Sequence, residues 1–243
     1  MKAERRALGS ADPTRWPVRT VLFDLDGTLL DTAPDMAYAL NRLLEERHRP
    51  CLPFERIRPL VSNGSAGLIR YAFQRAPQDP DFEDLRQRFL ALYRDNLVRD
   101  TRVFPGMDEV LSTLESARIQ WGVVTNKPAW LTDPLLQQLG LWERAACVVS
   151  GDTTQNRKPH PEPLYHACKV AGHPPQRCLY VGDAKRDIEA GQRAGMKTLV
   201  ALFGYLGDED GPESWGADGM VEHPADLLDW IAHEGCADDA EPV

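Results

Sequence analysis

Two aspartates separated by one residue, Asp24 and Asp26, are the side chains of this sequence best placed to do chemistry. They follow a short apolar run, residues 21–23, of the kind found in buried parallel strands. Residues i and i+2 of a strand project from the same face, so the two carboxylates can converge on one point. A hard cation with oxygen ligands, most simply Mg²⁺, would relieve their mutual repulsion. Taken alone, the pair also fits a solvated acidic turn, whereas the spacing of a calcium loop does not match.

Polar side chains also follow three later apolar runs. Thr125 and Asn126 offer a hydroxyl and neighbouring backbone N–H groups that can hold phosphoryl oxygens. Lys158 offers a compact positive charge. Asp183 and Asp187, one helical turn apart, could supply a metal carboxylate and a residue that ligates through water or orients the lysine. Each has an ordinary alternative: a helix cap or turn for the threonine and the aspartates, and a solvated side chain for the lysine.

The elements that must position these groups alternate between strand and helix after residue 118. We expect strands over 119–125, 147–150, 178–182, 198–203 and near 220–221, and helices over 131–139, 162–171, 188–194 and 225–233. Such alternation predicts an α/β fold, a Rossmann-like parallel sheet with helices on both faces. Open sheets of this type gather ligands at the carboxyl ends of their strands, so the polar groups are expected to meet at one edge.

The segment between residues 35 and 102 interrupts this pattern, because no convincing strand is found in it. Apolar spacing predicts helices over 33–47, 65–74 and 82–98. An inserted all-helical cap after the first strand is the best account. The predicted organisation is therefore a flexible N-terminal tail at 1–17, an α/β core at 18–33 and 103–233, a cap at 34–102 and a flexible C-terminal tail at 234–243.

Composition narrows the possible partners and compartment. The chain has 243 residues with a net charge of −9, so nothing suggests a nucleic-acid surface. Its five cysteines are odd in number and never form a Cys-x-x-Cys pair, which argues against a disulfide framework and a structural zinc site. No secretory signal or membrane span is recognised. We therefore expect a cytoplasmic enzyme, monomeric or homodimeric, that handles a small phosphorylated metabolite without nucleic-acid or membrane partners.

Four motifs in this order, each at the exit of a predicted strand, resemble the haloacid dehalogenase superfamily in its phosphatase branch. The matching residues are Asp24-Leu25-Asp26-Gly27-Thr28, Thr125-Asn126, Lys158, and Gly182-Asp183 with Asp187. The resemblance covers nearly the whole chain from residue 18 to residue 231, including the helical cap. It implies a phosphoric monoester hydrolase, because the dehalogenases lack the second aspartate of the first motif.

The resemblance also implies roles for the acidic residues. Asp24 would attack phosphorus to give an aspartyl-phosphate, and Asp26 would act as general acid and then as general base. Mg²⁺ would be held by Asp24, the backbone carbonyl of Asp26, and Asp183. Asp187 would lie behind these ligands.

The remaining predicted site residues bind substrate. Thr125, the Asn126 region and Lys158 would neutralise the phosphate oxygens. Ser62 and Asn63, between two cap helices, are expected to reach the rest of the substrate, although residues 62–65 also fit an ordinary helix-connecting turn.

The substrate is predicted from smaller similarities. Residues 29–35, 122–128 and 157–161 most resemble bacterial phosphoglycolate phosphatases, which implies 2-phosphoglycolate as substrate. N-acetylmuramic acid 6-phosphate phosphatases are very similar in the same stretches, and their substrate is the alternative. A sugar phosphomutase and a non-enzymatic phosphate-binding protein are less favoured, since residues 33–37 lack the mutase pattern and both catalytic acids are present.

Overall fold

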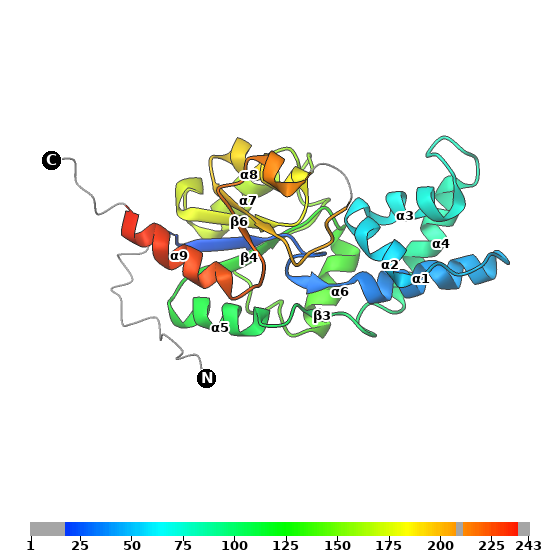
Figure 1. The fold of residues 1–243 in the computed structure, drawn as a ribbon, viewed down its shortest axis with the longest axis horizontal. Helices are drawn as coiled ribbons and strands as arrows, with labels where there is room; N and C mark the ends of the chain where they lie inside the picture. Colours follow the sequence, from blue (N-terminus) through cyan, green and yellow to red (C-terminus); the bar gives the residue numbers. More distant parts are fainter. Residues whose placement is uncertain (1–17, 208–210, 238–243) are drawn as a thin grey trace.

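The computed structural model describes residues 18–207 and 211–237. A parallel sheet of six strands, in the order β5-β4-β1-β6-β7-β8, forms its centre (Figure 1). The strands are β1 (Thr20–Phe23), β4 (Gln120–Val124), β5 (Val148–Val149), β6 (Cys178–Gly182), β7 (Lys197–Ala201) and β8 (Gly219–Val221). Phe23 pairs with Val123 on one side and Val181 on the other, so the residues that follow β1, β4 and β6 emerge at one edge.

Helices cover both faces of the sheet, as predicted for an α/β fold. They are α5 (Met107–Ser116), α6 (Ala129–Gln138), α7 (Glu162–Ala171), α8 (Lys185–Ala194) and α9 (Asp226–Ala237). The alternation of strand side chains divides the core in two. Val21 and Phe23 pack with α5, α6 and α9, whereas Leu22 packs with α7 and α8.

A second group of helices lies at one end of the molecule, beyond the carboxyl edge of the sheet (Figure 1). We call it the cap: α1 (Ala33–Glu46), α2 (Phe54–Ile57), the 3-10 helix η1 (Arg58–Asn63), α3 (Gly64–Phe73) and α4 (Phe82–Arg94). A two-stranded antiparallel ribbon, β2 (Leu30–Asp31) with β3 (Arg102–Val103), connects it to the core. The buried Asp35 carboxylate ties the two connections together by accepting bonds from the N–H groups of Asp100 and Thr101.

The structure differs from the sequence predictions at several boundaries. The ribbon, α2, α5 and the 3-10 helices were not predicted, and the third cap helix ends at Arg94 rather than residue 98. Helix α9 continues to Ala237, so the first four residues of the predicted C-terminal tail are helical. The rest of that tail and the predicted N-terminal tail lie outside the described residues. Within the described ranges, no helix is long and apolar enough to span a membrane.

Candidate active site

Three buried carboxylates meet at the edge of the sheet where β1 and β6 end. Asp24 follows β1, Asp183 follows β6, and Asp187 lies in the first turn of α8. One oxygen from each carboxylate lies within 4.8 Å of the others, and all three residues are at most 3% exposed. Strand pairing therefore brings together the groups predicted at two separate strand exits. Because such a cluster carries excess negative charge in a poorly hydrated place, it needs cationic partners.

Lys158 is the first of those partners, and it is not a solvated lysine. Its side chain is fully buried, and its Nζ lies 2.9 Å from Oδ1 of Asp24 and 2.7 Å from Oδ1 of Asp187. The same ammonium donates to the carbonyl of Val124 and to the hydroxyl of Tyr180. Asp187 therefore pairs with the lysine directly, which is the orienting role that the sequence left open.

The position of Lys158 is fixed from its backbone by Asn126. The Asn126 amide donates to the carbonyl of Lys158 and accepts from its N–H, both at 3.0 Å. The side-chain amide of Asn126 is therefore engaged with the backbone of Lys158, which leaves the predicted contact of backbone N–H groups with phosphate unaffected. Thr125 lies where it was predicted, buried beside the cavity, and its Oγ1 accepts a bond from the N–H of Lys127. A contact of Asn126 with phosphate would therefore be made by its backbone N–H group.

The carboxylates differ in proton affinity. Burial favours the protonated form of Asp24, but Lys158 and Arg186 outweigh it and hold the pKa of this carboxyl below its usual range. Among the described residues, no cationic side chain forms an ion pair with Asp183. Burial, followed by the negative charges of Asp24 and Asp187, raises the pKa of Asp183 to about 7. Asp24 is thus ionised and suited to be a nucleophile, while Asp183 is only partly ionised at neutral pH and a further cation would favour its ionised form.

The surroundings of Asp183 fit a bound divalent cation. Its Oδ2 accepts bonds from the hydroxyl of Ser62 and the N–H of Tyr205, whereas its Oδ1 is buried without a hydrogen-bond partner among the described residues. A Cβ at Gly27 would collide with this carboxylate, and Gly27 has φ +86°, so a glycine is needed beside the site. An unpartnered buried carboxylate oxygen within an all-oxygen donor set suits a hard ion such as Mg²⁺.

Asp26 belongs to a separate group of contacts. Its Oδ1 accepts a hydrogen bond from the hydroxyl of Thr32 and forms an ion pair with Nζ of Lys127, and both distances are 2.6 Å. Lys127 also donates to the hydroxyl of Tyr93, which lies on cap helix α4. The second aspartate of the first motif is therefore contacted from the core and, through one lysine, from the cap.

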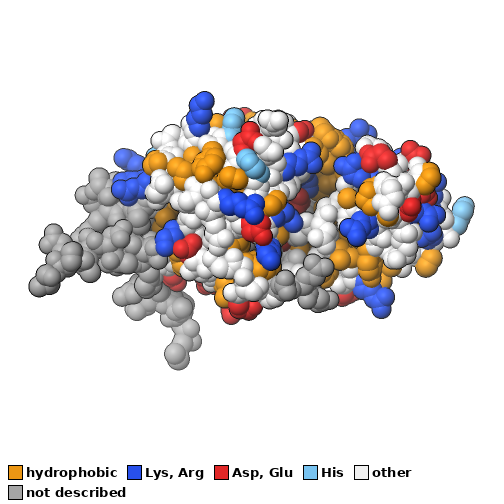
Figure 2. Space-filling model, turned by 90° about the horizontal axis from the view of Figure 1, so that it is seen from above, with side chains coloured by type: hydrophobic (Ala, Val, Ile, Leu, Met, Phe, Trp, Pro, Cys, Tyr) orange, Lys and Arg blue, Asp and Glu red, His pale blue; other side chains and the backbone are white. Residues whose placement is uncertain are grey.

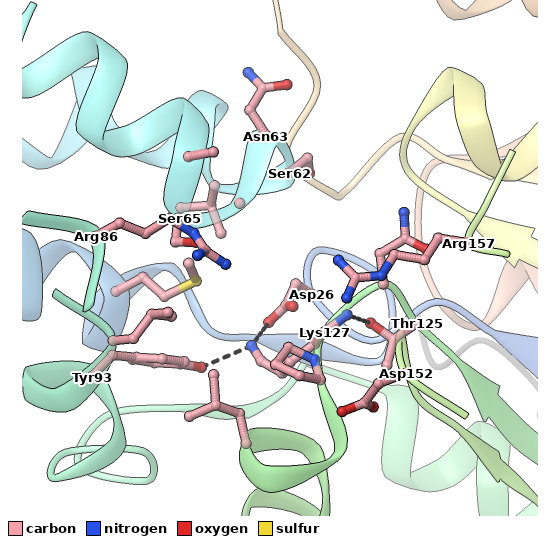
Figure 3. Close-up of a pocket in the computed structure, with 18 of the residues that line it drawn as sticks. Asp26, Ser62, Asn63, Ser65, Arg86, Tyr93, Thr125, Lys127, Asp152 and Arg157 are labelled. Atoms are coloured by element: carbon pink, nitrogen blue, oxygen red, sulfur yellow. Dashed lines mark hydrogen bonds and ion pairs between the residues drawn. The ribbon is translucent and has the colours of Figure 1, made fainter. Parts of the chain in front are cut away.

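A cavity of about 730 Å³ lies between the cap and the core, with Asp24 and Asp26 in its wall. It is the hollow seen between the two parts in Figure 2, with Lys and Arg side chains around its rim. Figure 3 shows Arg86 and Ser65 on the cap side of the cavity and Arg157, Thr125 and Asp152 on the core side. Other residues in its wall are Met36, Val61, Ser62, Asn63, Gly64, Ala66, Leu90, Tyr93, Asn126, Lys127, Trp130 and Arg186.

Cap and core are in direct contact beside this cavity. The hydroxyl of Ser62 lies 2.8 Å from Oδ2 of Asp183, and the guanidinium of Arg58 donates to the carbonyls of Gly204 and Phe203. Ser62 and Asn63, which were expected to reach the substrate, both line the cavity, and Ser62 also bonds the acidic cluster. The cavity of about 730 Å³ is therefore present in a structure in which the cap and the core are already in contact.

The sequence did not single out the basic residues of this cavity, which include Lys127, Arg86, Arg157 and Arg186. Lys127, Arg157 and Arg186 each adjoin a predicted motif residue, which was an available signal. Arg86 lies on the last cap helix, α4, where solvated arginines are common. Their side chains give an acidic protein a local positive surface for an anionic ligand.

An aspartate-bearing strand end, a buried lysine and an acidic cluster beneath a helical cap are what the resemblance implied. A family model for haloacid dehalogenase-like hydrolases matches residues 21–201, and the chain belongs to this family. It is 44% identical over 210 residues to an N-acetylmuramic acid 6-phosphate phosphatase of Pseudomonas putida, covering 86% of this chain and 94% of the relative. It is 46% identical over 214 residues to a phosphoglycolate phosphatase of Xanthomonas campestris pv. campestris, covering 88% and 96%.

A similar fold is also found among solved structures. A predicted phosphoglycolate phosphatase from Haemophilus somnus 129pt superimposes with a TM-score of 0.78 at 28% identity, covering 88% of this chain and 98% of that one. The predicted superfamily, fold class and class of phosphoric monoester hydrolases are thereby confirmed. The relatives carry both substrate names that the sequence suggested, so these names do not choose between them.

Proposed function

We propose that this chain hydrolyses phosphomonoesters with Mg²⁺, using Asp24 as the nucleophile. The observation that carries the proposal is the ion pair at 2.9 Å between the buried Asp24 and Lys158, in the wall of a cavity that also contains Asp26. Oδ1 of Asp24 accepts from Lys158 and from the N–H of Leu25, which fixes the carboxylate. We assign the attack to Oδ2, which carries neither bond.

The reaction then needs two proton transfers at Asp26. As Oδ2 of Asp24 bonds to phosphorus, the bond from phosphorus to the ester oxygen breaks, and Asp26 gives its proton to the leaving oxygen. Asp26 next takes a proton from water, whose oxygen attacks phosphorus. Inorganic phosphate leaves and the carboxylate of Asp24 is restored. Thr125 and Lys158 would stabilise the charge on the phosphate oxygens.

Asp24, Asp183 and the backbone carbonyl of Asp26 are the groups that would hold Mg²⁺, with Asp187 behind them holding Lys158. Once bound, the ion supplies positive charge to the phosphate and to the carboxylates. The unpartnered Oδ1 of Asp183 supports this assignment.

The charge and size of the cavity favour a bulky substrate that carries a carboxylate as well as its phosphate. Both candidate substrates have such a carboxylate, and the guanidinium groups of Arg86 and Arg157 could pair with it. A cavity of about 730 Å³ lies within the range of about 300–1,000 Å³ for pockets that hold drug-sized ligands. N-acetylmuramic acid 6-phosphate would fill it far better than the two-carbon 2-phosphoglycolate. Trp130, 46% exposed in the cavity wall, offers an aromatic face to a sugar ring.

Competition between the two substrates tests this choice. Each would be supplied to the purified enzyme with Mg²⁺, and kcat/KM would be measured from phosphate release. Because contacts remote from the reacting bond appear in turnover as well as binding, the substrate that fills the cavity should have the higher kcat/KM. A clear preference for the muramic acid ester supports the cavity argument. A clear preference for 2-phosphoglycolate would contradict the cavity argument and support the substrate expected from the sequence.

A further inference from the structure

Tyr93 connects the cap to the acid/base aspartate. It lies on cap helix α4, is 1% exposed, and stacks on Phe89 of the same helix with ring planes 8° apart. Its hydroxyl accepts a hydrogen bond of 3.1 Å from Nζ of Lys127, which also lies 4.8 Å from the centre of the Tyr93 ring. Lys127 in turn lies 2.6 Å from Oδ1 of Asp26. The dashed lines from Tyr93 to Lys127 and from Lys127 to Asp26 in Figure 3 trace this connection.

The connection fixes one carboxylate oxygen of Asp26. The side chain of Lys127 is 5% exposed and that of Asp26 is 19% exposed, so water competes weakly for their ion pair. The hydroxyl of Thr32 donates to the same Oδ1. Since both donors bond Oδ1, Oδ2 is the oxygen left to carry the transferred proton. A lysine has a long and mobile side chain, and the ring and hydroxyl of Tyr93 restrict it to this geometry.

We propose that Tyr93 is a positioning residue for the hydrolysis: by holding Lys127 against Asp26, it makes proton transfer efficient only when helix α4 is seated on the core. The inference rests on the proposed function of Asp26. Tyr93 itself contacts neither Asp24 nor the acidic cluster in the described contacts, so its effect passes through Lys127. The contact of Ser62 with Asp183 is a separate connection between cap and core, at the acidic cluster.

Tyr93→Phe tests the proposal, because it keeps the ring and removes the hydroxyl. With an alkyl phosphate as substrate, kcat should fall by about tenfold or more, as expected for loss of a hydrogen bond to a charged group, while KM stays unchanged. With an activated aryl phosphate the loss should be less than about twofold, since its leaving oxygen needs little protonation. Tyr38→Phe removes a hydroxyl from cap helix α1 away from the cavity wall and should change neither rate.

A double-mutant cycle separates positioning from a structural role. If Tyr93 acts through Asp26, Tyr93→Phe should cause no further loss in the Asp26→Asn enzyme, measured with the alkyl phosphate on which it slows the wild-type enzyme. Lys127→Met should reproduce the dependence on leaving group, which keeps the test valid if Tyr93→Phe melts early. Equal losses on both substrates, an additional loss in the Asp26→Asn background, or unchanged rates would each overturn the proposal. Failure of wild-type enzyme to release phosphate from any ester would instead refute the proposed function.

Discussion

The ammonium of Lys158 lies between the carboxylates of Asp24 and Asp187, 2.9 Å from the first and 2.7 Å from the second. This buried cation pairs with two buried anions and, together with Arg186, holds the candidate nucleophile in its ionised form. Asp183, the third carboxylate of the cluster, has no ion pair of this kind among the described contacts. The negative charges of Asp24 and Asp187 are therefore compensated, whereas the carboxylate of Asp183 can still take a further cation.

Removal of the Lys158 charge should destabilise the protein and abolish turnover. Breaking a buried ion pair by removing one partner leaves an uncompensated charge and typically costs about 3–5 kcal/mol of unfolding free energy. Lys158→Met should show a loss of this order in chemical denaturation without metal. Lys197→Met is the matched control, because Lys197 pairs with Asp218 at the surface, where such pairs contribute about 1 kcal/mol or less. Similar losses in the two variants would contradict the buried-pair account.

Asp183→Asn should stabilise the metal-free protein more at pH 8 than at pH 5. Folding raises the pKa of Asp183 from 3.8 to about 7, so the folded state binds this proton more tightly. The contribution of the group to stability is therefore lost as pH rises from about 4 to about 7, by about 4 kcal/mol. Asparagine removes the charge and keeps an acceptor for Ser62 and Tyr205.

The measurement is the difference in Tm between Asp183→Asn and wild type in excess chelator, followed across this pH range. It should grow with pH. Excess Mg²⁺ should reduce or reverse it, because the variant has lost an anionic ligand and should need more Mg²⁺ for activity. A pH-independent difference, or full wild-type activity in excess chelator, would argue against a metal at this carboxylate.

Asp26→Asn should separate substrates by their leaving groups. General acid–base assistance contributes on the order of 10²–10⁴-fold, so hydrolysis of an alkyl phosphate should fall by about that factor. An activated aryl phosphate should lose much less. Steady-state phosphate release for both esters, with the fold of the variant checked by thermal melting, gives the comparison. Equal losses for the two esters would remove Asp26 from its acid/base role.

Arg86→Ala should lower kcat/KM for the carboxylate-bearing substrate while it leaves hydrolysis of a small aryl phosphate nearly intact. Arg86 is held at the cavity by Ser65 and Glu83, so its guanidinium is presented to the substrate. A hydrogen bond to a charged group is worth about 1.5–3 kcal/mol, which corresponds to roughly 10- to 100-fold. Arg88→Ala, on the same helix but paired with Glu46 outside the cavity wall, is the matched control.

Substitutions at Ser62 and Asn63, in the cap loop formed by residues 62–65, should affect substrate specificity as Arg86→Ala does. Asn63→Ala alters a residue that lines the cavity without a described hydrogen bond, so it should change the ratio of kcat/KM for the two candidate substrates. Ser62→Gly should change this ratio and also raise the Mg²⁺ requirement, because Ser62 bonds Asp183. If the substitutions lower the rate with an aryl phosphate as much as the rates with the two candidate substrates, the loop does not determine specificity.

The core and the acidic residues could be predicted because their positions depend on local patterns. Apolar runs ended by polar groups mark β1, β4 and β6, and parallel pairing then forces Asp24 and Asp183 together. Helix α5 was not predicted, although its sequence has an equally clear pattern, with Met107, Val110, Leu111 and Leu114 buried at helical spacing. Strands β2 and β3 have two residues each, too few to leave any periodicity.

The cap side of the site could not be predicted in the same way. Arg86 and Tyr93 lie on one amphipathic helix, and the sequence does not show which of its residues will face the core across a cavity. That depends on how the cap docks, through Arg58 and Ser62, onto loops that follow β6 and β7. The part played by the Asn126 side chain was also not predicted, because its amide bonds the backbone of Lys158, 32 residues further along the chain.

Phosphate release by Asp24→Asn is the most direct test of the central claim. Asparagine keeps the size of the side chain and removes the nucleophilic charge, so the variant should fold and bind the ester but release no phosphate above background. The assay would use each candidate substrate and an aryl phosphate with saturating Mg²⁺, and thermal melting would confirm the fold. Loss of turnover on every ester is the predicted result. Near-normal turnover by the folded variant would contradict nucleophilic attack by Asp24.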